Sequence, residues 1–155
     1  MIKKIVLWIL VILTCAMIFN FSSKEGNNSY EQSEAVTKKV ENVVTQITDK
    51  ESSYANFERV HKFVRKQGHF IEFAILGIFV FLLVRCYDFS MKKSLIIALL
   101  FVLFYAATDE IHQLFVEGRT GRVKDVFIDF FGSVIGIGIV YPFEARKLKK
   151  KKKQL

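Results

Sequence analysis

Residues 109–129 of this chain, DEIHQLFVEGRTGRVKDVFID, hold five carboxylates, three basic side chains and one histidine between two apolar runs. Carboxylates and histidines are common general acids and bases in enzymes, and both also bind metal ions. A second group, Arg65, His69 and Glu72, follows i, i+4, i+7 spacing, which places all three on one helical face. Whether these groups form a site depends on the elements that position them.

Helical spacing also relates the polar residues at the two ends of the 109–129 segment. Tyr105, Asp109 and His112 repeat the i, i+4, i+7 pattern, and Asp125 and Asp129 are i, i+4. The face of Asp129 continues through glycines at 132 and 136, a small-xxx-small pattern that permits close approach of two helices. We therefore expect the last helix to pack by its glycines and to bring Asp129 against a neighbour.

The composition indicates a membrane protein. Hydrophobic residues make up 52% of the chain, the net charge is +8, and the apolar residues fall in long blocks. Cys15 and Cys86 lie within or at the end of these blocks, so we interpret them as small apolar side chains rather than a disulfide or a metal pair. One domain is expected for 155 residues.

Four uncharged runs define the expected helices. They are Ile5–Ser23, Phe73–Val84, Ser94–Thr108 and Phe130–Phe143, of 19, 12, 15 and 14 residues. A membrane span needs about 20 helical residues, so the last three must either carry charged residues into the membrane or be buried helices of a soluble protein. Because the runs are apolar around the whole helix, we favour membrane spans.

The sequence therefore predicts an all-α, four-helix transmembrane bundle in a single domain, residues 1–155. We place the spans at about 4–22, 67–86, 93–114 and 125–143, an outer segment at 23–66 and a basic tail at 144–155. Valines and isoleucine at helical spacing in 36–47 predict an amphipathic helix in the outer segment, and 57–64 predicts a second, shorter one. A cleaved signal peptide or lipidation at Cys15 is the alternative for the first run, but no convincing cleavage site follows it.

Basic residues near the spans predict the orientation. With the N-terminus inside, the inner side holds 12 basic and 2 acidic residues, whereas the outer side holds 11 basic and 13 acidic residues. Excess Lys and Arg mark cytoplasmic loops, so we expect both termini inside. We expect the tail to anchor the topology at the lipid surface and not to bind nucleic acid.

This topology brings the polar ends of all four helices to the outer level of the membrane. Ionisable residues at such depth cost about 2.5–3.5 kcal/mol each and usually face the bundle interior in pairs. Two interpretations stay open, a set of ion pairs that holds the bundle together and a polar pocket that binds a ligand. The candidate residues are Ser22, Ser23, Arg65, His69, Glu72, Asp109, Glu110, His112, Gln113, Arg119, Arg122, Asp125 and Asp129.

Metal binding and nucleophilic catalysis have weaker signals. The weak metal candidates are His69, Glu72, Asp109 and His112, but HxxE and DExH are not an established zinc motif, so we expect no metal and no cofactor. The serines at 22, 23 and 133 have no base that spacing alone identifies. A dinucleotide or phosphate-loop motif is absent from the sequence.

Four motifs in register resemble those of VanZ-like membrane proteins. They are FSS at 21–23, RKxxHFxEF at 65–73, DEIHQLFxxGR at 109–119 and DVxxDxxGSxxG at 125–136. The resemblance covers most of the chain, to about Gly138. Lys24 and Glu117 depart from the family pattern, where Gln and Pro are usual, which removes an amide after FSS and loosens the turn before Arg119.

The resemblance implies a multi-pass protein of the bacterial cytoplasmic membrane. The family is named for a protein associated with resistance to teicoplanin-type glycopeptides. It leads us to expect a non-enzymatic protein whose partners are membrane lipids and a lipid-linked cell-wall component or a lipoglycopeptide. Arg119, Arg122 and Lys124 would contact anionic groups of such a ligand.

Two other classes remain as alternatives. A membrane enzyme acting on a lipid head group would use Glu72, Asp109 or Glu110 as base and His69 or His112 as acid or metal ligand. An ion-coupled transporter has less support, because no acid is predicted in the inner half of any helix.

Overall fold

The computed structural model describes residues 1–23, 38–40, 42–43, 46, 54–117, 119 and 121–153. Its long helices are α1 (Ile2–Ser23), α3 (Tyr54–Val84), α4 (Met91–Gln113) and α5 (Val123–Lys153). Strands are absent from these described ranges. All four helices are long and apolar enough to cross a membrane. The all-helical class and the four spans predicted from the sequence are therefore confirmed.

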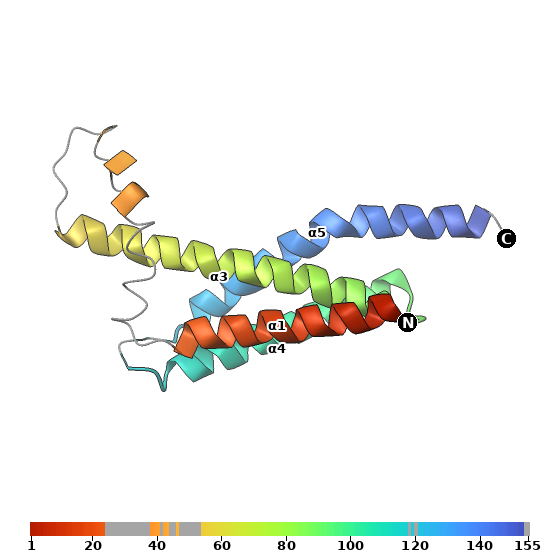
Figure 1. Ribbon diagram of the computed structural model, residues 1–155, viewed down its shortest axis with the longest axis horizontal. Helices are drawn as coiled ribbons and strands as arrows, with labels where there is room; N and C mark the ends of the chain where they lie inside the picture. Colours follow the sequence, from red (N-terminus) through yellow and green to blue (C-terminus); the bar gives the residue numbers. More distant parts are fainter. Residues whose placement is uncertain are drawn as a thin grey trace.

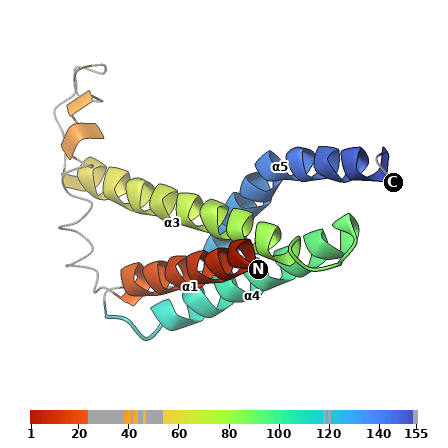
Figure 2. The ribbon, with the colours of Figure 1, turned by 45° about the vertical axis from the view of Figure 1, so that its right-hand side comes forward.

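The four helices form one elongated bundle (Figure 1, Figure 2). The start of α1, the α3–α4 connection and the last turns of α5 lie at one end, which we call the basic end. The C-terminal end of α1, the α4–α5 connection and the start of α5 lie at the other, which we call the acidic end. Because four is an even number of spans, both termini lie on the same side of the bundle. The orientation across a membrane and the exact span limits stay predictions.

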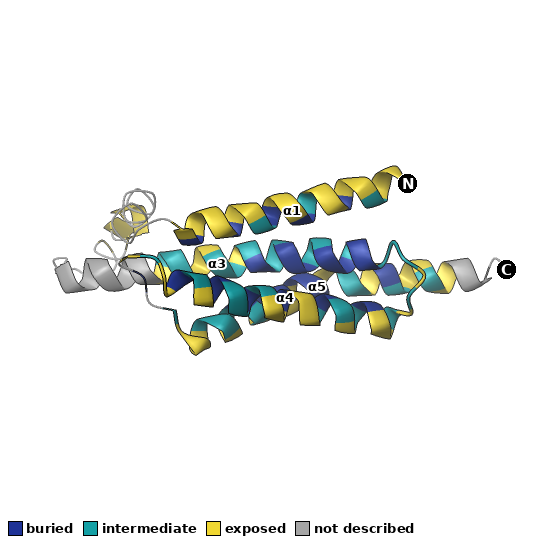
Figure 3. Ribbon diagram, turned by 90° about the horizontal axis from the view of Figure 1, so that it is seen from below, coloured by how far each residue is buried: buried dark blue, intermediate teal, exposed yellow. Residues whose placement is uncertain are grey.

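A narrow stripe of α1 faces the bundle. Its buried residues are Leu7, Val11, Thr14, Ile18 and Ser22, at helical spacing of three or four. The remainder of α1 is exposed and apolar (Figure 3). A soluble monomer rarely exposes so continuous an apolar surface, whereas a lipid-facing helix requires one.

Glycines bring α3 and α5 into backbone contact. A Cβ on Gly136 would overlap the backbone oxygen of Ala74, and a Cβ on Gly132 would overlap that of Phe70. One turn along, a Cβ on Gly77 would lie 2.8 Å from the backbone oxygen of Ser133. Small residues allow this approach in membrane helices. The predicted glycine packing of the last helix is thus confirmed, with α3 as its partner.

The ends of two helices differ from the expected limits. The segment predicted as a short helix at 57–64 is helical, but it is continuous with α3, which begins at Tyr54. Half of the predicted helix at 36–47 lies outside the described residues, and the described half, residues 38–40, 42–43 and 46, is helical. At the other end of the chain, α5 runs on through the basic tail to Lys153. Pro142 lies inside α5 and lacks the donor for one helical hydrogen bond, and Figure 1 shows that this helix bends.

The basic end is closed by the α3–α4 connection. Arg85 donates from Nη1 to the backbone oxygen of Phe89 at 2.7 Å, which folds the connection back on α3. Trp8 of α1 donates to the Tyr87 hydroxyl at 3.2 Å, and the Lys4 ammonium lies 3.5 Å from the centre of the Tyr87 ring. These contacts fix the start of α1 against the connection, opposite to the acidic end.

The glycine contact generates a stability prediction. Gly136→Leu places a side chain against the α3 backbone, and overpacking of this kind typically costs about 1–3 kcal/mol. We expect the free energy of unfolding in detergent to fall by at least about 2 kcal/mol. Gly138→Leu is the matched control, because nothing lies within 4 Å of its added Cβ. Equal stability of the two variants would contradict the contact.

The predicted orientation has a direct test in intact bacteria. Glu117 lies in the connection at the acidic end and Asp88 in the connection at the basic end, and both are exposed. In a chain with Cys15 and Cys86 replaced by alanine, Glu117→Cys should react with a membrane-impermeant maleimide in intact cells. Asp88→Cys should react only after permeabilisation. The reverse pattern would show that the termini are outside.

Candidate functional site

Asp109, near the end of α4, is buried at the acidic end with 4% of its surface exposed. Its Oδ2 accepts hydrogen bonds from Ser22 Oγ of α1 and from Gln113 Nε2, both at 2.9 Å. Its Oδ1 is buried and has no hydrogen-bond partner. The carboxylate therefore joins α4 to the C-terminal end of α1 through one oxygen and leaves the other available.

Glu110, the next residue of α4, is 6% exposed and points toward α5. Gln113 Nε2 donates to its Oε1 at 3.2 Å, and the backbone N–H of Arg122 donates to its Oε2 at 2.7 Å. A Cβ on Gly121 would overlap the backbone oxygen of Glu110, so this glycine lets the connection lie directly on the end of α4. The glutamate thereby fixes the path of the chain into α5.

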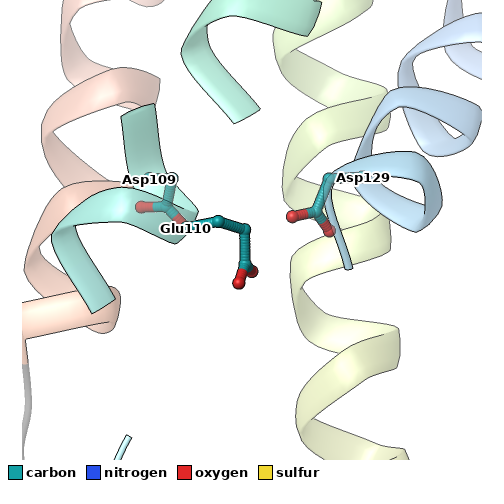
Figure 4. A group of neighbouring side chains, drawn as sticks. All are labelled: Asp109, Glu110 and Asp129. Atoms are coloured by element: carbon teal, nitrogen blue, oxygen red, sulfur yellow. The ribbon is translucent and has the colours of Figure 1, made fainter. Parts of the chain in front are cut away.

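The first turns of α5 contribute two more carboxylates. Asp125 is half-buried and forms an ion pair with Lys66 of α3. Asp129, one turn on, is 3% exposed, and its side chain extends toward Glu110 from the opposite helix (Figure 4). One oxygen from each of Asp109, Glu110 and Asp129 lies within 4.8 Å of the others. We call these three residues the carboxylate trio. They are the only group of three acidic residues in the described part of the chain whose oxygens lie this close together.

The polar face of α3 completes the cluster. His69 Nδ1 lies 3.6 Å from Glu72 Oε2, and neither atom has a hydrogen-bond partner. A small cavity of about 20 Å³ lies between the polar face of α3 and the neighbouring ends of α4 and α5. It is lined by Arg65, Lys66, His69, Glu110, Gln113, Asp125, Ile128 and Asp129. This space accommodates one water molecule or one ion and is too small for a lipid head group.

Arg119 of the α4–α5 connection lies beside the cluster and is 8% exposed. Its Nη2 donates to the backbone oxygen of Phe21 at 2.6 Å, which caps the C-terminal end of α1 with a cation. Burial, together with the nearby Arg65, lowers the pKa of the Arg119 guanidinium to about 10, while Asp109 and Glu110 oppose this shift. Arg119 therefore keeps its charge at neutral pH.

His112 lies on the same face of α4 as Tyr105 and Asp109, as its spacing predicts, and all three residues contact α1. Its ring stacks on Phe19 of α1 with the centroids 4.4 Å apart, and its Nε2 lies 3.0 Å from Ser23 Oγ. Ser23 uses its own hydroxyl hydrogen to bond the Phe19 backbone oxygen at 2.6 Å. The imidazole then donates to Ser23, so this pair is not arranged as a nucleophile with its base.

A larger, mostly apolar groove adjoins the trio between α4 and the start of α5. Its volume is about 330 Å³, within the usual range for small-molecule pockets. It is lined by Ala107, Glu110, Ile111, Leu114, Gly121, Arg122, Val123 and Val126. Glu110 borders both this groove, which we call the α4–α5 groove, and the small cavity. A polar compartment and an apolar compartment therefore share one carboxylate.

The structure brings together most, but not all, of the residues that the sequence nominated. His69, Glu110, Gln113, Asp125 and Asp129 line the cavity or the trio, whereas His112 and Ser23 face each other beside α1. The four weak metal candidates are not gathered into one group. Lys66 was missed as a site residue, although it lies one turn before His69, and that spacing was the available signal.

The fold and the buried acids define a four-helix membrane protein with a polar cluster at one end of its bundle. The chain matches the family model of VanZ/LLP1 over residues 7–144 and belongs to this family. The family resemblance inferred from the four motifs is confirmed. No curated protein and no solved structure matches the chain.

Two adjacent serines test the link between α1 and Asp109. Ser22 is fully buried and donates to the carboxylate, whereas Ser23 is exposed. Ser22→Ala should lower the free energy of unfolding by about 1.5–3 kcal/mol, the range for hydrogen bonds to charged groups. Ser23→Ala, the matched control, should stay within about 0.5 kcal/mol of wild type. Denaturant or thermal unfolding in detergent measures both, and equal effects would contradict the assignment.

Proposed function

We propose that this protein binds the lipid chain of a lipid-linked cell-wall component in the α4–α5 groove. We further propose that this binding lowers the susceptibility of the bacterium to teicoplanin-type lipoglycopeptides. The single observation that carries the proposal is the position of Glu110, which borders both the apolar groove and the polar cavity. An amphiphilic ligand requires such a junction, because its chain and its head need different surroundings.

The groove supports a lipid chain as the occupant. Its walls are mainly aliphatic, and Ile111, Leu114 and Val123 are all more than half exposed, so a molecule in the surrounding membrane can reach them. The groove lies at the ends of α4 and α5, two helices long and apolar enough to span a membrane, and includes residues of the connection between them. A chain that enters from the membrane leaves lipid and not water, so its binding depends on packing contacts with the groove walls. The small cavity has room for a water molecule or an ion, so we expect the polar head group at the rim of the groove.

The rim of the groove supports a polar head group. Arg122 lines the groove, and its side chain is exposed because only its backbone N–H is held by Glu110. Lys124, in the first turn of α5, adds a second exposed cation, whereas Arg119 is buried and donates to the Phe21 backbone oxygen. Arginine forks suit phosphate and carboxylate groups. A phosphate-bearing carrier of the bacterial cytoplasmic membrane fits this arrangement of chain site and cationic rim.

The alternative, an enzyme acting on a lipid head group, receives less support from the geometry. An enzyme of this type needs a base within hydrogen-bond reach of a nucleophile or a water molecule. His112 donates to Ser23, and Asp109 and Glu110 each accept hydrogen bonds from neighbouring groups. Glu72 beside His69 remains the best candidate for a base in this alternative.

A matched pair of substitutions tests the groove. Val126→Phe fills it, whereas Val134→Phe adds the same bulk to an exposed position two turns along α5. We expect Val126→Phe to weaken binding of a polyprenyl phosphate in nanodiscs at least tenfold, about 1.4 kcal/mol. In a susceptible bacterium expressing the chain, it should also restore teicoplanin susceptibility. Val134→Phe should match wild type in both assays.

Arg122→Gln tests the rim separately. It removes the exposed charge and keeps the backbone N–H that Glu110 accepts. The variant should bind the polyprenyl phosphate more weakly, and its deficit should shrink at high salt because exposed charges are screened. The proposal fails if filling the groove and removing this charge both leave binding and susceptibility at wild-type levels in folded protein.

A further inference from the structure

Among the described residues, the polar cluster at the acidic end contains more acidic than basic side chains. Five carboxylates surround or adjoin the small cavity, namely Glu72, Asp109, Glu110, Asp125 and Asp129. The basic side chains among the described residues of this cluster are Arg65, Lys66 and Arg119, with His69 able to stay neutral. If every acid were ionised, two negative charges would remain. Uncompensated charge at membrane depth is costly, so two protons or one divalent cation must balance it.

The surplus concentrates on the carboxylate trio. Lys66 is paired with Asp125, at the edge of the cavity. Arg119 donates to the Phe21 backbone oxygen and also interacts electrostatically with Asp109 and Glu110, so it compensates part of their charge. Asp109, Glu110 and Asp129 each have 6% of their surface or less exposed, and one oxygen from each lies within 4.8 Å of the others. Three ionised carboxylates so close repel one another, so either a proton or a cation must reduce their charge.

A second observation points to a ligand in this place. Asp109 is 96% buried, yet its Oδ1 has no hydrogen-bond partner. Buried polar atoms are nearly always satisfied, so an orphan carboxylate oxygen implies an unseen partner. Ser22 and Gln113 hold Oδ2 of the same group. Figure 4 shows one Asp109 oxygen directed toward α1 and the other on the side of Glu110.

We propose that Asp109, Glu110 and Asp129 bind one divalent cation that prefers oxygen ligands, of the Ca²⁺ or Mn²⁺ type. Ca²⁺–O distances of about 2.3–2.6 Å place oxygens on opposite sides of the ion about 4.6–5.2 Å apart, which covers the observed separation. The adjoining cavity of about 20 Å³ holds the water that completes the coordination. Zinc is disfavoured, because the trio offers neither nitrogen nor sulfur.

The cation links α4 to the start of α5, which are also the two walls of the α4–α5 groove. The sequence led us to expect no metal and nominated histidine-containing ligands, whereas this set contains only carboxylates and includes Asp129. The proposal does not depend on the occupant of the groove. Its consequences are therefore measured on the purified chain without any lipid ligand.

The test uses Mn²⁺ and Ca²⁺ with purified, chelator-treated protein in detergent. Electron paramagnetic resonance of Mn²⁺ should show one bound ion per chain, displaced by Ca²⁺, and either ion should raise the thermal unfolding midpoint by several degrees. Asp129→Asn should weaken Mn²⁺ binding at least tenfold and abolish the thermal shift. Asp88→Asn, the same substitution at the exposed basic end, should keep both.

Measuring the stability of Asp129→Asn without metal shows whether the variant is folded. Removing one of three mutually repelling carboxylates should leave the chelated variant as stable as the chelated wild type or more stable. Loss of stability in chelator would show that Asp129 serves as an ion-pair partner and would overturn the proposal. Failure of wild type to bind Mn²⁺ at millimolar concentration, or unchanged binding by Asp129→Asn, would overturn it as well.

Discussion

Charged groups that lie at membrane depth must be neutralised by the protein itself, and the acidic end of this bundle is organised by that constraint. Lipid offers no hydrogen bonds, so each buried carboxylate depends on donors from other helices. Ser22 of α1 serves Asp109, the backbone of Arg122 serves Glu110, and Lys66 of α3 serves Asp125. These contacts involve residues of all four helices, and the ion-pair and pocket interpretations both stay predictions.

Close helix packing makes this arrangement possible. The glycine contact between α3 and α5 brings the first turns of α5 near the polar face of α3, and Ser133 reinforces it by donating to the Phe73 backbone oxygen at 2.8 Å. Asp125 and Asp129 lie on the turns just before this contact, so the glycines determine how closely the acids approach Lys66 and the end of α4. Uncharged residues at the contact between the helices thereby determine the distances between the charged groups of the site.

The sequence predicted the fold because the lengths of the apolar runs and the positions of the charges can be read along the chain without knowing how the helices pack. Short apolar runs required charged residues inside the spans, and the order of the helices placed them at one end. Spacing could not fix the rotation of each helix about its axis. Spacing places His112 and Asp109 on one face of α4, but it does not show that this face meets α1 while Glu110, the residue after Asp109, faces α5. The donor role of the Arg122 backbone depends on the path of a connection, which spacing does not encode, whereas the position of Lys66 one turn before His69 was a signal in the sequence.

The central claim is that polar contacts at the acidic end join helices that are distant in sequence. A double-mutant cycle between Ser22 of α1 and Asp109 of α4 tests it most directly, with Ser22→Ala, Asp109→Ala and the combined variant unfolded under identical conditions. The account predicts a coupling energy of about 1 kcal/mol or more, because each single substitution already removes the shared hydrogen bond. Effects that add to within about 0.5 kcal/mol would show that the two residues act independently and would contradict the account.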